Sequence, residues 1–367
     1  MKRGTIFILL FVVVAAAIIG ASQFIGAQPP LEITVAVNTI ARPWVEKVVF
    51  AFNETAPIVN ATRRVRIKLT EIDDLDVWLE GRAWTTNDHP AAWIPASSTS
   101  VTYAVEAGLP LQLVADSLAR TPLVWGGFSS RVNILTGGAA PLDWPQVAAA
   151  AKAESWSDIG GSPSWQFVKL AFAQPTRRMS GLAVMLSGAA AFNESPSLAA
   201  DSLRARAFRD WIQPVIHAVP NFNTLGSDPA AALARQGPSG GEIGLLPEVD
   251  WLINLNRLVG YERMVFSYPA YQMILDFPLA RWDDTQTTND ERAAVEALRG
   301  WLLNADWQII VPQYGLRPAG GEPTEDDTLF AAGIPYGIQL NPDFGQLVQP
   351  PARAEVQGFV DWVASNG

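Results

Sequence analysis

Three short stretches of this chain place small polar side chains where a helix is expected to begin. Residues 37–39 read "VNT", residues 96–100 read "ASSTS" and residues 176–181 read "TRRMSG". Hydroxyl and amide groups beside the unpaired amides of a helix start can hold an anion or a carbonyl oxygen of a bound molecule. The candidate binding residues in these stretches are Asn38, Thr39, Ser97, Ser98, Thr99, Arg177, Ser180 and Gly181.

The third stretch also has a simpler interpretation. A serine before a run of small apolar residues often caps a helix, because its oxygen accepts one of the unpaired first-turn amides. Ser180 fits that pattern, and Arg177 and Arg178 beside it add a positive charge that a cap does not need. The residues alone therefore leave two interpretations open, a helix cap and a recognition corner.

Several motifs that usually carry catalysis are absent from the sequence. It has no Ser-x-x-Lys, His-Glu-x-x-His or phosphate-loop pattern, and its two histidines, His89 and His217, stand in no recognisable arrangement with a nucleophile. Asp73, Asp74 and Asp76 lack the glycine and the spaced glutamate of a calcium loop, and we interpret them as the solvated start of a helix. We expect no enzyme activity, no metal site and no cofactor.

Composition limits the class of protein further. The 367 residues carry a formal net charge of -10, which argues against a nucleic-acid partner because nucleic-acid binders present a basic face. There is no cysteine, so disulfides cannot stabilise the chain. Burial must do so instead, and the length is sufficient for two domains with sizeable cores.

The first 30 residues differ from the rest. Lys2 and Arg3 are followed by no charge until Glu32, as in an export or anchoring segment. A helix over residues 5–27 would be about 34 Å long, which suffices to cross a hydrocarbon layer of roughly 30 Å. The length favours an uncleaved membrane anchor, and a cleaved signal peptide is the alternative. In either case the remainder is expected outside the cytoplasm.

From residue 31 onward, β-branched segments alternate with amphipathic ones. The stretch 31–37 predicts a strand, and a polar break at 38–39 then leads into a helix. Repetition of this pattern predicts an α/β fold with mostly parallel sheets flanked by helices. In such sheets ligands bind beyond the carboxyl ends of the strands, where the three polar stretches are expected.

A succession of segments carries a resemblance to a known family. In order they are "HPAAWIPASSTSVTYA", "RTPLVWGGF", "WQFVKLAFAQPTRRMSGLAVML", "EIGLLPEVDWL", "MVFSYPAYQMILDFPLA" and "LRGWLLNADWQIIVPQYGLRP". The set resembles bacterial extracellular solute-binding proteins of the type II periplasmic-binding-protein fold. Within that fold it is most similar to the binding regions that precede a von Willebrand factor A domain in some bacterial proteins. The chain shows no Asp-x-Ser-x-Ser metal motif after those segments.

The resemblance implies two α/β lobes that close on a solute. It assigns residues 31–121 plus 269–367 to lobe one and residues 122–268 to lobe two, with crossings near 121–125 and 266–271. It also places Glu248 at a strand end in the cleft, although an exposed loop carboxylate is equally consistent with that position.

The predicted function follows from these points. We expect an extracytoplasmic, membrane-tethered, monomeric protein that captures a small solute, possible partners being the permease of an ABC-type transporter and the membrane itself. The alternative is an interaction module that uses the same scaffold to bind a partner protein. Trp78, Trp84 and Trp93 are interpreted as core residues rather than a sugar-stacking platform.

Overall fold

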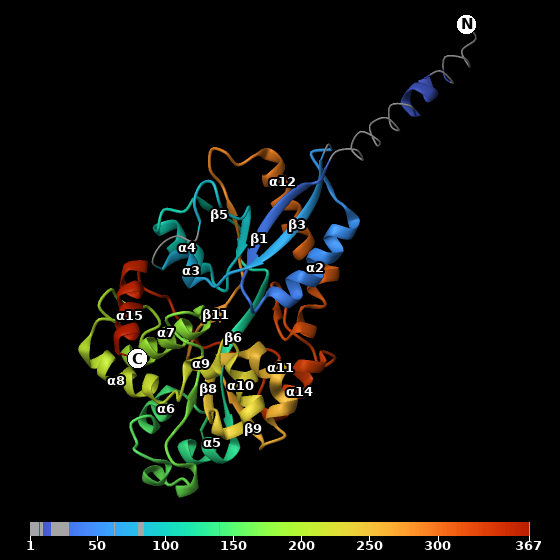
Figure 1. Cartoon of the computed structure of the whole chain (residues 1–367). Helices are drawn as coiled ribbons and strands as arrows, with labels where there is room; N and C mark the ends of the chain where they lie inside the picture. The colour runs from blue at the N-terminus through green and yellow to red at the C-terminus, as the bar shows by residue number, and fades with distance from the viewer. Residues whose placement is uncertain are drawn as a thin grey trace.

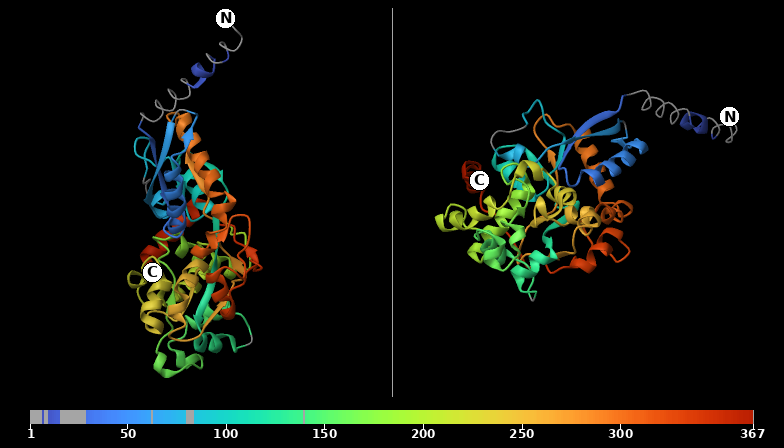
Figure 2. Two further views of the ribbon diagram at one scale, coloured as in Figure 1. Left: turned by 90° about the vertical axis from the view of Figure 1, so that its right-hand side faces the viewer. Right: turned by 60° about the horizontal axis from the view of Figure 1, so that its bottom comes forward.

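The computed structural model describes residues 7, 10–15, 29–61, 63–79, 84–138 and 140–366. Most of the predicted anchor at 5–27 lies outside these residues. Among the described residues, no helix has the length and apolar character needed to cross a membrane. From residue 29 the chain builds two bodies stacked end to end, which we call lobe one and lobe two (Figures 1 and 2).

Lobe one is built on a six-stranded sheet in the order β2-β3-β1-β4-β12-β5. Its three central strands β3, β1 and β4 are parallel, and their ends coincide because Val37 pairs with both Glu71 and Ile94. The strands are β1 (Leu31–Val37), β2 (Ile58–Val59), β3 (Arg63–Glu71), β4 (Ala92–Ile94), β5 (Leu111–Ala115) and β12 (Leu279–Trp282).

Helices pack against this sheet through apolar faces. Helix α2 buries Trp44, Val45, Val48, Val49 and Phe52, a helical repeat directed at the core. The N-terminus of α12 is fixed by a capping box between Thr288 and Glu291. The helices of this lobe are α2 (Arg42–Thr55), α3 (Leu75–Trp78), α4 (Ser98–Glu106) and α12 (Asn289–Leu302).

Strand β6 (Ala119–Phe128) carries the chain into lobe two. Its first residues pair with the returning strand β11 (Ile274–Leu275) and with β13 (Arg317–Pro318), and its later residues pair with β8 (Ile243–Pro247) and β9 (Met264–Ser267). Strand β7 (Leu170–Ala171) extends the sheet beside β8. The return connection is thus β11, a few residues beyond the predicted crossing at 266–271, and the lobe boundaries stay a prediction.

Helices surround the second sheet as well. Helix α7 is buried along most of its length, consistent with its run of small and apolar residues. The helices are α5 (Ser129–Thr136), α6 (Trp144–Ala150), α7 (Met179–Asn193), α8 (Arg206–His217), α9 (Phe222–Leu225), α10 (Pro229–Gln236) and α11 (Glu248–Leu258).

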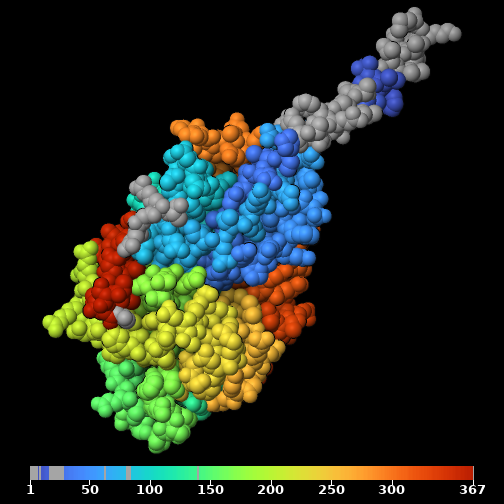
Figure 3. All heavy atoms as spheres, viewed as in Figure 1, coloured from blue at the N-terminus to red at the C-terminus, as the bar shows by residue number. Residues whose placement is uncertain are grey.

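The C-terminal segment contacts both lobes. Helix α15 (Arg353–Asn366) lies along one side of the molecule in Figure 3, and its Phe359 packs on Phe208 of α8. Just before it, the hydroxyl of Tyr103 in α4 donates a hydrogen bond to the Pro351 carbonyl at 2.5 Å. The remaining elements are α13 (Ala305–Gln308), α14 (Thr328–Gly333), and β14 (Gln346–Leu347) paired with β10 (Tyr271–Gln272).

The predicted two-lobe α/β architecture is confirmed, but the strand directions differ from the prediction. Both sheets are mixed rather than mostly parallel, because β12 runs antiparallel to β4 and β5, and β6 runs antiparallel to β8, β9 and β11. The physical reason is that the chain enters lobe two on β6 and returns on β11 and β12. Returning segments oppose the direction of the strands they join.

Candidate ligand-binding cleft between the lobes

Asp74 joins the two polar stretches of lobe one, residues 37–39 and 96–100, which we call its two corners. Its carboxylate accepts hydrogen bonds from Asn38 Nδ2 at 2.8 Å and from the Ala96 amide at 2.9 and 3.0 Å, and more weakly from the Ser97 amide at 3.3 Å. Asp74 is fully buried, and Asn38 and Ser97 are buried beside it. The structure therefore brings Asn38 and Ser97 together, around an aspartate that was not predicted to lie there.

The corner before α4 is held by two further contacts. The Ser97 hydroxyl caps the helix by accepting from the Thr99 amide at 3.2 Å. The Ser98 amide donates to Asp276 Oδ1 at 2.7 Å, at the return connection between the lobes. Burial raises the pKa of Asp276, and the hydrogen bonds from Ser98 oppose that shift. Thr39 and Thr99 are half-buried, and within the described residues neither has a side-chain hydrogen bond.

Lobe two contributes the start of α7. That helix begins at Met179 with Arg178 at the cap position and no capping side chain, so the interpretation of Ser180 as a helix cap is wrong. Ser180 is the second residue of the helix and only 8% exposed, and its hydroxyl has no hydrogen bond to the described residues. A Cβ built on Gly181 would overlap the carbonyl oxygen of Ala173, so only glycine fits that close approach.

One ion pair crosses the boundary between the lobes at this point. Arg178 Nη1 lies 3.5 Å from Asp73 Oδ2, and the two residues flank a cavity of about 400 Å³. The cavity is lined by Glu71, Ile72, Asp73 and Asp76 of lobe one and by Arg177 and Arg178 of lobe two. It lies where the carboxyl end of β3 faces the start of α7, as expected for a ligand site in an open α/β sheet.

The prediction that the three aspartates form a solvated helix start is wrong for two of them. Asp73 and Asp74 are 7% and 0% exposed, and only Asp76 is exposed. Burial is the main cause that raises the pKa of Asp73 to about 7 and that of Asp74 to about 6. The charge of Asp74 raises the Asp73 value further, whereas the hydrogen bonds from Ala96 and Asn38 oppose the rise at Asp74. The sequence did hold a signal for their position at the site. Asp73 and Asp74 follow the parallel strand β3, whose carboxyl end lies beside those of β1 and β4.

Glu248 lies in a separate cluster. Its Oε2 contacts Arg317 Nε at 2.6 Å and its Oε1 contacts Arg317 Nη2 at 2.8 Å, and both side chains are fully buried. The Tyr268 hydroxyl also donates to Glu248. This bidentate pair links the first residue of α11 to β13 beside the crossing strand β6. Glu248 does not line the cavity described above.

The tryptophans and histidines lie elsewhere. Trp78, Trp84 and Trp93 are 1%, 8% and 0% exposed, so the core interpretation is confirmed. His89 stacks on the Trp282 ring at 4.0 Å. Within the described residues, no group of three or more His, Cys, Asp or Glu side chains could hold a metal ion.

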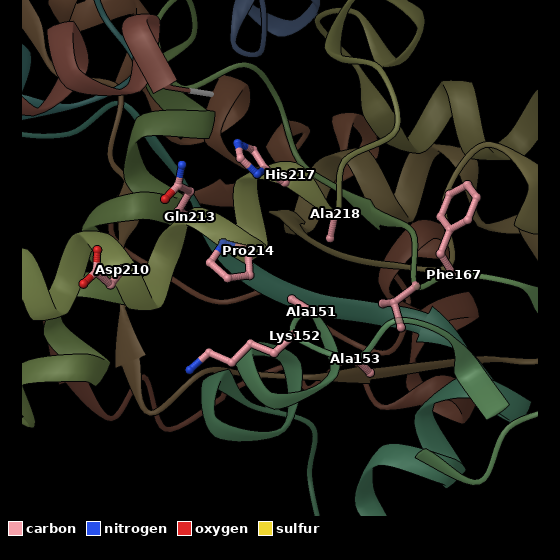
Figure 4. A pocket seen from close by; sticks show the side chains of 10 residues that line it. Ala151, Lys152, Ala153, Phe167, Asp210, Gln213, Pro214, His217 and Ala218 are labelled. Atoms are coloured by element: carbon pink, nitrogen blue, oxygen red, sulfur yellow. The ribbon is translucent and has the colours of Figure 1, made fainter. Parts of the chain in front are cut away.

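A larger cavity of about 740 Å³ lies on lobe two alone. Figure 4 shows α8 presenting Asp210, Gln213, Pro214 and His217 toward it, opposite Lys152. His217 Nε2 lies 2.9 Å from the Asn366 carbonyl oxygen near the end of α15. No described residue of lobe one lines this cavity, so closure of one lobe on the other would not enclose a molecule there.

Comparison with solved structures shows the same fold in several bacterial binding proteins. The periplasmic binding protein AfuA of Actinobacillus pleuropneumoniae, with fructose-6-phosphate bound, is 11% identical over 91% of this chain and 98% of its own, with a TM-score of 0.60. An ABC transporter solute-binding protein of Thermotoga lettingae bound with α-D-tagatose is 12% identical over 90% of this chain and 93% of its own, with a TM-score of 0.59. The sulfate-binding protein SubI of Mycobacterium tuberculosis is 15% identical over 90% and 98%, with a TM-score of 0.50.

No family profile and no curated protein matches the sequence. The structural likeness at these identities shows the fold alone. The chain has the two-lobe type II periplasmic-binding-protein fold, with a charged cavity at the boundary between its lobes.

Proposed function

We propose that this protein is an extracytoplasmic solute-binding protein that captures a small molecule between its two lobes and does not turn it over. The observation that carries the proposal is the cavity of about 400 Å³ lined by side chains from both lobes. Its volume lies in the lower range of small-molecule sites. The solved structures of the same fold are described as binding sulfate, a sugar or a sugar phosphate, which supports a small solute here.

The predicted site residues divide into two groups under this proposal. Arg177 lines the cavity, whereas Thr39, Thr99 and Ser180 lie outside its lining. All four side chains lack hydrogen-bond partners among the described residues, and we propose that they contact the solute when the lobes close. Asn38, Ser97, Ser98 and Gly181 are engaged in internal contacts and would position the others. Glu248 is engaged with Arg317 in its separate cluster.

Ligand-dependent stabilisation tests the proposal. A bound solute at a hundred times its dissociation constant stabilises the folded state by about 2.7 kcal/mol, which raises the melting temperature by several degrees. We expect such a shift with one member of a panel of oxyanions, sugars, amino acids and short peptides. Ser180→Ala should weaken binding by roughly 0.5–1.5 kcal/mol, whereas Ser365→Ala at the exposed end of α15 should leave affinity unchanged.

Location and partners complete the proposal. The uncharged stretch at 5–27 supports an N-terminal membrane anchor, and mass spectrometry of the mature N-terminus tests it, since a chain that begins near residue 23 or 28 would show cleavage. We propose that the protein is a monomer and that its partner is the permease of an ABC-type transporter. The similarity to binding regions that precede a von Willebrand factor A domain remains part of this proposal.

A tethered interaction module is the second candidate. The observation that favours it is the internal bonding of Asn38 and Ser97 to Asp74, which takes two predicted recognition groups away from a solute. If no compound in the panel shifts the melting temperature while a partner protein captured on the folded chain does, this second function replaces the first.

A further inference from the structure

The cavity between the lobes carries charge of opposite sign on its two walls. Lobe one presents three carboxylates, those of Glu71, Asp73 and Asp76, and lobe two presents the guanidinium groups of Arg177 and Arg178. Among the described residues that line the cavity, Ile72 alone is apolar. A molecule in this cavity therefore meets negative charge on one side and positive charge on the other.

Three of these five charged side chains already have partners within the protein. Glu71 accepts from Arg42 Nη1 at 2.6 Å, and Asp73 faces Arg178 at 3.5 Å. In the described part of the chain, Asp76 and Arg177 have no side-chain hydrogen bond and no ion pair. The cavity thus offers one unpaired acid from lobe one and one unpaired base from lobe two.

This arrangement disfavours several classes of solute. A sulfate or phosphate ion would have to approach three carboxylates, and a simple cation would have to approach two guanidinium groups. A sugar ring commonly packs on an aromatic face, yet no aromatic residue is among those that line the cavity in the described structure. The volume of about 400 Å³ is at the small end for ligand sites, which argues against a peptide of several residues.

We infer that the cavity binds a small zwitterion, a free amino acid being the simplest case, with its ammonium group on Asp76 and its carboxylate on Arg177. This inference rests on the proposed function and names the solute class of the same site. Asp73 and Arg178, which pair with each other, line the cavity beside these two groups. A bound zwitterion would link an acidic residue of lobe one to a basic residue of lobe two, as the direct ion pair between Asp73 and Arg178 does.

Matched probes test the two charges separately. Isothermal titration calorimetry of the full chain is first run with each free amino acid, and also with sulfate and with a set of monosaccharides. The amino acid that binds is then replaced by its N-acetyl derivative, which lacks the cation, and by its carboxamide, which lacks the anion. We expect both derivatives to bind at least about tenfold more weakly, because each loses a charge-assisted hydrogen bond.

Two substitutions link this preference to the named residues. Asp76→Asn and Arg177→Gln change exposed side chains, so the fold is retained, and each should lower the affinity for the amino acid about tenfold or more. Asp76→Asn should also abolish the difference in affinity between the amino acid and its N-acetyl derivative. Arg177→Gln should abolish the difference in affinity between the amino acid and its carboxamide. Asp326→Asn and Arg206→Gln, which make the same charge changes at exposed positions away from the cavity, should leave affinity unchanged.

The outcomes separate this inference from the proposed function. Binding of sulfate or a sugar without binding of any amino acid overturns the zwitterion inference and leaves the solute-binding function intact. Equal binding of the amino acid and both derivatives overturns it as well. Absence of binding by every probe class overturns both, and selective amino-acid binding that is lost in the two cavity variants supports both.

Discussion

Asp73 and Arg178 meet across the boundary between the lobes, with Arg178 Nη1 3.5 Å from Asp73 Oδ2. The aspartate is buried and the arginine is partly exposed, with 34% of its side chain accessible. The contact joins the end of β3 to the cap position of α7, two elements that the sheet topology places in different lobes. The charge state of a buried carboxylate therefore affects a contact that joins the two lobes.

The first prediction concerns that charge state. Burial, followed by the charge of Asp74, raises the pKa of Asp73 to about 7, whereas an unfolded aspartate ionises near pH 4. Between these values the folded chain binds more protons than the unfolded chain, so the free energy of unfolding falls as the pH rises from about 4 to about 7. Asp73→Asn cannot ionise, and should be more stable than the parent near pH 8 by roughly 1–3 kcal/mol.

Urea unfolding at a series of pH values measures this effect. Asp74, Asp76 and Arg178 are the other charged groups that face Asp73. All three are still present in the variant, so their own ionisation affects both proteins. Asp326→Asn, at an exposed position, should keep the pH dependence of the parent. A variant at Asp73 that is less stable than the parent near pH 8 would show that the ionised aspartate stabilises the fold through Arg178.

The sequence predicted the two corners of lobe one because local signals define them. Residues 31–37 alternate as a strand should, and the polar residues after Val37 and after Ile94 stand where parallel strands end. The burial of Asp74 depends instead on the Ala96 amide 22 residues away, and the pair between Asp73 and Arg178 joins residues 105 apart. Such contacts depend on which strands are neighbours, which local pattern does not specify.

The position of Glu248 illustrates the same limit. The family resemblance implied a position at a strand end, where α11 does begin, but the partner of Glu248, Arg317, lies 69 residues later on β13. A glutamate at a helix start looks identical in sequence whether it faces solvent, a ligand or a buried arginine. Strand directions were misjudged for a related reason, since a chain that crosses between lobes twice brings returning strands into both sheets.

The second prediction tests the buried pair of Glu248 and Arg317. Glu248→Ala leaves a fully buried guanidinium without its bidentate partner and should destabilise the fold by about 3–5 kcal/mol in urea unfolding. Glu322→Ala removes a partly exposed carboxylate from the same arginine and should cost far less, about 1 kcal/mol or below.

A double variant separates packing from charge. Glu248→Leu combined with Arg317→Met replaces both charges by apolar groups, and should recover much of the stability lost in Glu248→Ala. If Glu248→Ala instead keeps its stability and loses affinity for the solute, Glu248 is a ligand contact as the family resemblance implies.

The third prediction concerns the corner that Asp74 holds together. In Asp74→Asn one carboxylate oxygen becomes an amide nitrogen facing the donors of Ala96, Ser97 and Asn38, so at least one buried donor loses its acceptor. We expect a loss of roughly 1–3 kcal/mol of stability near pH 5, below the raised pKa of about 6 at Asp74, where the cost of ionising the buried carboxyl does not enter the comparison. Asp76→Asn, two residues along and exposed, should leave stability unchanged. Equal stability of the two variants in urea unfolding would contradict the role given to Asp74.

The last prediction addresses the start of α7. Gly181→Ala would bring a Cβ into the carbonyl oxygen of Ala173, and because the obstacle is backbone, the first turn of the helix must shift. Overpacking of this kind costs about 1–3 kcal/mol, and the shift would move Ser180 and the arginines before it relative to lobe one. Gly300→Ala provides the control, since nothing lies within 4 Å of its Cβ position on α12 and an alanine inside a helix is favoured by roughly 0.5–1 kcal/mol.

Thermal unfolding and calorimetric titration of both glycine variants distinguish stability from recognition. Gly300→Ala should melt at or above the parent temperature and bind with unchanged affinity. Gly181→Ala should melt lower, and its affinity should fall further than stability alone explains, because the folded fraction of the variant still presents a displaced corner to the solute. A Gly181→Ala protein that melts lower but binds as tightly as the parent would assign the start of α7 to packing, and would remove Ser180 and Arg177 from the proposed site.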